Sequence, residues 1–425
     1  MIVERWLSRV VAVRPEEVRA LLWSFAYFFC LLASYYILRP LRDEMGVAGG
    51  VRNLQWLFTA TFLTMLAAVP CYGALVARLP RRRFIPLVYH FFVANLAIFW
   101  LLLTLGVERQ LVARVFFVWI SVFNLFAVSV FWSFMADLYS SEQGKRLYGF
   151  IAAGGSVGAL AGPAITIGLA QAIGVVNLLT VAALLLEAAV ICAARLETKE
   201  QVIVKSVQPL GGGPLDGLMM ILRSPYIAGI TLWVALLSVA ATFLYFEQAA
   251  IVAAASDDPA VRTRIFATVD LAVGVLTLAV QCFATGKLIQ RFGVGAALAL
   301  VPLVFTVGFA VLAAAPVLLV VIAFQALQRT ANFAISNPAR EVLFTVVARD
   351  EKYKAKNVID MVAVRGADAA GGWLITGLRA LGMEARAIAA AAIALAAACI
   401  ALSVALGRAQ ARRAEERTAA APARL

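Results

Sequence analysis

The sequence predicts an all-helical membrane protein in which twelve transmembrane helices form two pseudo-symmetric six-helix bundles. Three observations support this fold class: the composition, the number of long apolar stretches, and a polar connector near the middle of the chain. Hydrophobic residues make up 63% of the 425 residues and charged residues only 14%. This balance is far from that of a soluble globular protein and is typical of a polytopic membrane protein.

The spans and the connector divide the chain into three parts. A membrane-spanning helix needs about 20 mostly apolar residues. Twelve stretches meet this requirement, at residues 18–40, 52–77, 84–105, 112–137, 147–171, 174–194, 226–254, 264–287, 293–314, 316–338, 357–379 and 385–407. Between the sixth and seventh stretches, Lys199, Lys205 and the run Gly211–Pro214 favour a flexible connector. We therefore expect an N-terminal six-helix bundle over 1–195, a cytoplasmic linker over 196–222, and a C-terminal six-helix bundle with a short cytoplasmic tail over 223–425.

Lysine and arginine are distributed unequally between the two sides of these spans. One set of loops and ends holds 25 of the 37 basic residues, the opposite loops hold seven, and five arginines lie inside apolar stretches. Basic loops stay on the cytoplasmic side. We therefore expect a multi-pass protein of the bacterial inner membrane with both termini in the cytoplasm. This bias accounts for the net charge of +13, so the charge does not indicate a nucleic-acid partner.

Residue types that carry catalysis are scarce. His90 is the only histidine, which excludes a histidine-based triad unless His90 is the base, and also excludes a His-rich zinc site. The five cysteines fall in separate apolar stretches without Cys-x-x-Cys spacing, as small core residues do. A phosphate-binding G-x-x-x-x-G-K-[ST] loop is also missing. We expect no enzyme activity, no metal and no cofactor; a lipid-modifying membrane enzyme is a weak alternative, because His90 beside Tyr89 offers little for a catalytic dyad.

The two halves of the sequence resemble each other at two cytoplasmic turns. Gly73–Arg83 and Gly286–Gly293 both place a small residue, apolar residues and basic residues at the end of a span. Ser141–Arg146 and Asp350–Lys356 both precede a glycine-bearing span. Two similar six-helix bundles are typical of secondary transporters of the major facilitator type.

One of the glycine-bearing spans repeats glycine at every fourth position. Gly154, Gly158 and Gly162 lie on one face of a helix, where small residues allow two helices to approach closely. We interpret this face as a packing surface rather than as a phosphate cradle.

Five arginines lie within or at the borders of otherwise apolar stretches: Arg39, Arg42, Arg329, Arg340 and Arg365. A guanidinium at bilayer depth costs a few kcal/mol and must face protein, water or a counter-charge. Ion pairs explain some of these arginines, and the candidate counter-charges are Asp43, Glu44, Asp137, Glu187, Glu247, Asp270, Glu341, Asp360 and Asp368. A polyanionic substrate would explain the rest, because arginine binds phosphate in a bidentate manner.

Four segments, in order along both halves, are similar to motifs of a known family. Ile37–Asp43 is similar to I-L-R-D-T-K-D, and Phe131–Asp137 with Glu142–Tyr148 is similar to F-W-G-F-A-N and E-A-K-R-F-Y. Asn337–Glu341 is similar to D-P-T-K-E-M, and Lys354–Asp360 to K-G-K-A-A-I-D. In these segments the chain resembles the ATP/ADP translocases of plastids and intracellular bacteria.

The resemblance implies a twelve-helix exchanger of nucleotides or related phosphate esters, with basic residues that bind the phosphates. Arg42 and Arg340 stand where the family has lysine, and Lys354 and Lys356 match in type. Asp360 and Glu341 also match in type, whereas Asp137 replaces an asparagine.

We therefore predict a secondary transporter of an organic, phosphorylated, nucleotide-like anion that works by alternating access as a monomer in the lipid bilayer. The substrate-binding candidates are Arg39, Arg42, Arg329, Arg340, Lys354 and Lys356. The coupling or counter-charge candidates are Asp43, Asp137, Glu247, Asp270, Glu341 and Asp360. The alternative function is a proton-coupled symporter or efflux permease of the major facilitator type for a different small solute.

Exchange and proton coupling both remain open at this level. Nine intramembrane acids against five arginines predict that some acids are left without an arginine partner, and an unpaired acid at bilayer depth takes up a proton. Asp270 is the favoured proton carrier because no basic residue lies within a helical turn of it. The alternative for Asp270 is an ion pair with an arginine from another span.

Overall fold

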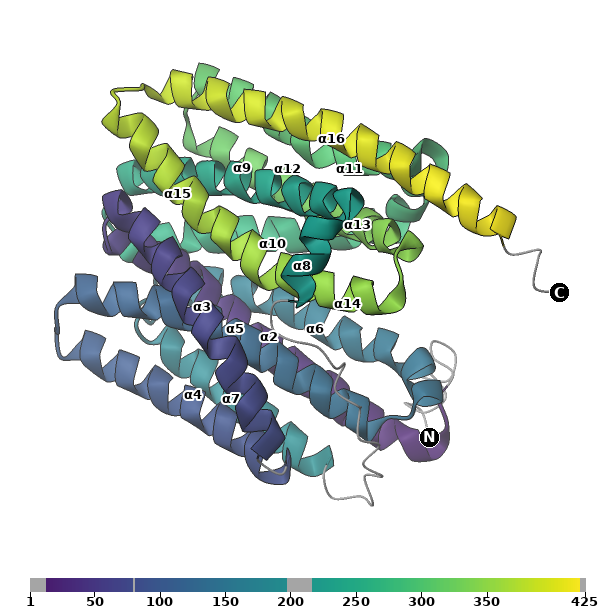
Figure 1. Cartoon of the computed structure of the whole chain (residues 1–425). Coiled ribbons are helices and arrows are strands. Elements are labelled where there is room, and N and C mark those ends of the chain that lie inside the picture. The colour runs from purple at the N-terminus through teal and green to yellow at the C-terminus, as the bar shows by residue number, and fades with distance from the viewer. Residues whose placement is uncertain (1–12, 79–80, 197–215, 421–425) are drawn as a thin grey trace. The chain divides into compact units, whose positions relative to one another are not determined.

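The computed structural model describes residues 13–78, 81–196 and 216–420, and in these ranges every regular element is a helix (Figure 1). The elements of the first half are η1 (Pro15–Glu17), α2 (Val18–Ala48), η2 (Val51–Asn53), α3 (Leu54–Arg78), α4 (Arg81–Thr104), α5 (Arg109–Leu138), α6 (Ser141–Leu169) and α7 (Leu178–Leu196). Those of the second half are α8 (Asp216–Arg223), α9 (Pro225–Ala255), α10 (Pro259–Phe283), α11 (Thr285–Ala314), α12 (Leu318–Ala331), η3 (Asn332–Ser336), α13 (Asn337–Leu343), η4 (Phe344–Val346), α14 (Arg349–Val358), η5 (Ile359–Ala363), α15 (Val364–Ala380) and α16 (Ala385–Ala420). The all-helical fold class is confirmed.

Eleven of the expected spans correspond to helices that are long and apolar enough to cross a membrane, within the described ranges. The twelfth, expected at 357–379, corresponds to η5 and α15, which carry the charged residues Asp360, Arg365, Asp368 and Arg379. These charges lower the mean hydropathy of the segment. The predicted linker lies outside the described residues over 197–215, and its last part forms the short helix α8.

The chain divides into two compact units. The first unit contains residues 1–50, 67–207 and 256–271, and the second contains 51–66, 208–255 and 272–425. The units therefore follow the two halves of the sequence except at two segments. The first half of α3 packs with the second unit, and the first half of α10 packs with the first unit.

In the first unit, α2 packs against α5, α6 and α7. The face of α6 that carries Gly154, Gly158 and Gly162 lies directly on the backbone of α2. A Cβ atom at Gly154 would lie 2.5 Å from the carbonyl oxygen of Phe25, and one at Gly162 would lie 2.7 Å from that of Ala33. Only glycine fits at this distance, so the glycine repeat is a packing surface, as the sequence predicted.

In the second unit, α9 packs against α15 and α16, and α11 packs along α16. A buried hydrogen bond from Trp233 Nε1 to Ser403 Oγ, 2.7 Å long, joins α9 to α16. The backbones of α11 and α16 meet at Gly295 and Gly407, where neither residue has a side chain. These small contacts set how closely the long C-terminal helix lies against its neighbours.

Three irregularities interrupt the spans of the second unit. Gly293 has a φ of 79° and breaks α11 near its start, which separates the turn around Lys287 from the span that follows. The segments η3 and η5 are π-helical. Such π-helical turns occur frequently at functional sites, and these two lie immediately before and after the stretch that contains Arg340 and Lys356.

Candidate functional site

The first charged cluster lies within the first unit and includes Arg39 on α2 and Asp270 on α10. Arg39 Nε is 3.8 Å from Asp270 Oδ1, and the Asp270 side chain is 1% exposed. The guanidinium also lies 5.8 Å from the ring centroid of Tyr36. Arg39 Nε is buried and has no hydrogen-bond partner among the described residues. Arg39 is therefore held by charge and by an aromatic ring while one of its donors stays unused.

Arg42 lies one turn further along α2. Its Nη2 donates to Asp43 Oδ1 at 2.6 Å, and its guanidinium carbon is 5.0 Å from the ring centroid of Phe117 on α5. Two predicted site residues, Arg42 and Asp43, are thus in direct contact. The aromatic ring beneath Arg42 fixes its direction by a cation–π interaction.

A third group in the same unit joins Glu44, one of the predicted counter-charges, to two arginines that were not predicted as site residues. Glu44 at the end of α2 has a fully buried side chain, and its Oε1 accepts a 2.8 Å hydrogen bond from Arg262 on α10. Arg109 at the start of α5 lies 3.5 Å from the same oxygen. Arg262 also donates to the carbonyl oxygens of Ser256 and Asp257. Arg109 and Arg262 fall between the predicted spans, and no local sequence pattern connects them to Glu44, which lies far away in the chain.

The second cluster lies within the second unit and joins α13 to α14 and η5. Arg340 Nη1 is 3.1 Å from Asp360 Oδ1, and Lys356 Nζ is 2.6 Å from Glu341 Oε1. Arg340 Nε is buried without a hydrogen-bond partner in the described part of the chain. All four residues were predicted as site residues, and the structure brings them together as two neighbouring ion pairs.

The remaining predicted residues lie elsewhere. Glu247 on α9 pairs at 2.8 Å with Arg379, the last residue of the predicted span 357–379, which was counted among the loop arginines. Arg329 lies in the last turn of α12 and Lys354 in α14. Asp137 lies in the last turns of α5, 20 residues after Phe117, and this spacing corresponds to about 30 Å along a helix. Asp137 is therefore remote from Arg42, which contacts Phe117.

Arg365, the fifth intramembrane arginine, forms a pair inside α15. Its Nη1 is 3.3 Å from Asp368 Oδ2, and the Ser238 hydroxyl of α9 donates to Asp368 Oδ1 at 2.6 Å. Arg365 is thus satisfied by a local ion pair that is itself tied to the neighbouring helix.

These pairs change the expected charge balance inside the spans. The prediction that acids are left without an arginine partner is wrong for Glu44 and Glu247, because arginines near the helix ends reach them. For Asp270 the alternative interpretation holds, since Arg39 from another span is its ion-pair partner. An arginine side chain is long enough to place its guanidinium away from its own backbone position. The position of an arginine in the sequence therefore does not show whether its charge lies within a span or in a loop.

The comparisons with known proteins show the fold. No model of a protein family matches the chain, and no curated protein sequence matches it. Among solved structures, a bacterial homologue of the iron transporter ferroportin superposes with a TM-score of 0.65 at 11% identity, covering 93% of this chain and 100% of that one. The nucleoside transporter NupG gives 0.63 at 13% identity, with 93% and 99% covered. The POT family transporter PepTSo gives 0.62 at 12% identity, with 95% and 98% covered.

These structures cover almost the whole chain, both halves included. The protein is therefore a multi-pass membrane protein with the fold of major facilitator type transporters. At identities this low, the shared feature is the fold.

Proposed function

We propose that the protein is a secondary transporter that moves a small organic anion, phosphorylated and nucleotide-like, across the bacterial inner membrane by alternating access. The observation that carries the proposal is the state of Arg39 and Arg340. Each arginine is paired with an acid from another helical segment, and each has a buried Nε without a hydrogen-bond partner among the described residues. A buried donor without an acceptor costs free energy, and a phosphate oxygen would supply the missing acceptor.

The ion pairs give the proposed cycle its physical basis. Without substrate, Asp270 and Asp360 neutralise the arginines, so that neither guanidinium stands as a bare charge in the membrane. A phosphorylated anion brings negative charge of its own and binds arginine in a bidentate manner. Substrate then competes with the acid, and the released acid changes the balance between conformations that differ in which partner the arginine has.

The two arginines lie at different points along their helices. Arg39 is in the last third of α2, and Arg340 is in the last turn of α13. The resemblance to the ATP/ADP translocases supports Arg42 and Arg340 as phosphate-binding positions, together with Lys354 and Lys356, and Lys356 pairs with Glu341 beside Arg340. Arg42, whose guanidinium is positioned by Asp43 and Phe117, would extend the anion site of the first unit.

The experiment that tests this function is uptake by purified protein in proteoliposomes. A panel of radiolabelled nucleotides, sugar phosphates and uncharged nucleosides is presented with and without the same compound inside. We expect uptake of phosphorylated compounds that Arg39→Ala and Arg340→Ala abolish and that Arg386→Ala, an exposed arginine at the start of α16, leaves intact. Selective uptake of nucleosides or cations, unaffected by the two alanine variants, would show that the anion proposal is wrong.

The alternative function, a proton-coupled symporter or efflux permease for another solute, is favoured by one observation. Asp270 is almost fully buried and lies at an ion-pair distance from Arg39 without a direct hydrogen bond to it. Protonation of such an acid would release Arg39 as substrate does. A pH gradient imposed on the same proteoliposomes separates the two functions, because a strict exchanger does not respond to it.

The proposed orientation has its own test. We infer from the basic loops that both termini lie in the cytoplasm. A reporter that is active only in the cytoplasm, fused after Leu425, should be active, and activity of a periplasm-specific reporter at the same position would contradict the topology.

A further inference from the structure

The C-terminal part of α16 borders a groove that has no part in the proposed transport cycle. The groove has a volume of about 810 Å³ and lies between the start of α9 and the last turns of α16. Its walls include Tyr226 and Gly229 from α9 and Leu402, Leu406, Arg412 and Arg413 from α16. This volume is within the range of about 300–1,000 Å³ that small-molecule sites occupy.

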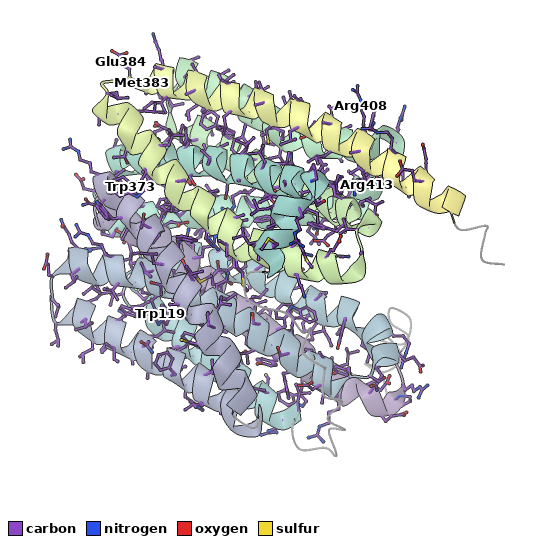
Figure 2. All side chains as sticks on the ribbon, viewed as in Figure 1. Trp119, Trp373, Met383, Glu384, Arg408 and Arg413 are labelled. Atoms are coloured by element: carbon purple, nitrogen blue, oxygen red, sulfur yellow. The ribbon has the colours of Figure 1, made fainter. Side chains whose placement is uncertain are left out.

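The groove changes from apolar to basic along α16. This helix has 36 residues, which corresponds to about 54 Å, whereas the hydrocarbon core is about 30 Å thick. The stretch from Ile388 to Gly407 carries no charged residue, and Arg408, Arg412 and Arg413 follow it. Figure 2 shows Arg408 and Arg413 at the opposite end of α16 from Met383 and Glu384. The basic end of the groove therefore lies where the helix leaves the hydrocarbon core.

The apolar part of the groove lies where α9 and α16 pack closely at a glycine. Gly229 faces α16, and a Cβ atom there would lie 3.2 Å from Leu406. The missing side chain lets Leu406 pack against α9, and Leu402 and Leu406 line the groove along α16. Leu402 and Leu406, the apolar floor of the groove, follow one another along the helix axis. An acyl chain in a bilayer also runs roughly along the axis of a spanning helix.

The basic end of the groove is positioned by an aromatic ring. The Arg413 guanidinium carbon lies 4.4 Å from the centroid of the Tyr226 ring. The Tyr226 hydroxyl donates to the carbonyl oxygen of Leu343 at 2.9 Å, which fixes the ring. Glu416 also borders the groove, yet neither Arg412 nor Arg413 forms an ion pair with any described residue. Both guanidinium groups keep their N–H donors for an anion.

We propose that this groove binds an anionic phospholipid of the cytoplasmic leaflet, with the headgroup phosphate on Arg412 and Arg413 and an acyl chain along Leu402 and Leu406. The assignment rests on the cytoplasmic placement of the C-terminus. Basic pockets between transmembrane helices on this side bind anionic headgroups. A free phosphate ion would bind the arginines without contacting the apolar floor. A phospholipid would contact both, and the continuity of the basic and apolar parts therefore favours a lipid.

The test measures lipid retention on the full-length protein in detergent by native mass spectrometry, together with thermal unfolding. Phosphatidylglycerol is the probe, phosphatidylcholine is the zwitterionic comparison, and glycerol phosphate supplies the headgroup without chains. We expect phosphatidylglycerol to bind and to raise the unfolding temperature, whereas the other two compounds do neither. Each arginine contributes about fivefold, so Arg412→Gln with Arg413→Gln should weaken binding about 30-fold.

Two control variants separate a site from a general charge effect. Arg386→Gln removes an exposed arginine from the opposite end of the same helix and should bind phosphatidylglycerol as the wild type does. Arg413→Lys keeps the charge and should retain part of the affinity. If the double variant folds and still binds phosphatidylglycerol as tightly as the wild type, the proposal is wrong. Equal protection by glycerol phosphate would overturn the lipid assignment and indicate a free-anion site.

Discussion

Exchange of the two charges at Arg340 and Asp360 separates a structural role of this pair from a substrate-binding role. The pair is 3.1 Å long, and its side chains are 17% and 39% exposed. At an effective dielectric constant of 20, the attraction between two such charges is about 5 kcal/mol. Desolvation of Arg340 and solvent screening at Asp360 reduce the net contribution to about 1–2 kcal/mol of folding stability.

We expect Arg340→Ala to lower the free energy of unfolding by about this amount and to reduce kcat/KM for the anion about 100-fold. The second value follows from the loss of charge-assisted hydrogen bonds to phosphate, worth about 3 kcal/mol. The double variant Arg340→Asp with Asp360→Arg restores the ion pair and should recover most of the stability. It should not recover transport, because the cation now stands on η5 instead of α13.

The assay is anion counterflow in proteoliposomes, combined with urea unfolding of the purified protein. The matched control is the neighbouring pair of Arg365 and Asp368, which has a similar length of 3.3 Å and no assigned contact with substrate. Arg365→Ala should keep transport within about threefold of the wild type while it costs a similar amount of stability. Wild-type counterflow in the Arg340→Asp, Asp360→Arg variant would refute the reasoning, because it would mean that Arg340 serves only the ion pair.

Three further predictions follow from the first unit. Arg262→Ala should lower the free energy of unfolding by about 3 kcal/mol, because the fully buried Glu44 then keeps only the longer pair with Arg109. The double variant with Glu44→Gln should recover part of this loss, and urea titrations measure both effects. Gly158→Ala should destabilise the protein by about 1–3 kcal/mol because the new Cβ meets the Phe29 backbone, whereas Gly168→Ala, with open space around it, should be neutral in the same measurement. Asp270→Asn should remove any uptake driven by a pH gradient and spare counterflow at equal concentrations; a wild-type protein that ignores the gradient would exclude proton coupling.

The sequence predicted the class of fold because that property is additive along the chain. Each apolar stretch can be assessed alone against the thickness of a bilayer, and eleven of them correspond, among the described residues, to helices long and apolar enough to cross a membrane. The glycine repeat of α6 was also predictable, since residues four apart share a helix face whatever the neighbour is. The ion pair of Arg42 and Asp43 is also a local feature, because the two residues are adjacent in the sequence.

The partners of the other charged side chains could not be predicted, because they depend on which helices meet. Asp270 is 231 residues from Arg39 in the sequence, and Glu44 is 218 residues from Arg262, yet both pairs form where the first half of α10 packs in the first unit. The π-helical segments η3, which precedes Arg340, and η5, which contains Asp360, were not predicted from the sequence either.

The sequence by itself determined that this protein is an all-helical, multi-pass membrane protein, and it predicted basic loops on one side and arginines at bilayer depth. Those properties follow from the free energy of transferring each residue from water to the membrane, which depends mainly on the residue type. Only the tertiary structure decided which acid neutralises which arginine, and that the donors of Arg39 and Arg340 are incompletely used. An ion pair requires two side chains to lie within a few ångströms of each other. Hydrophobicity makes each span favour the membrane but does not specify its neighbours, so the distance between two charged groups is fixed only when the helices pack.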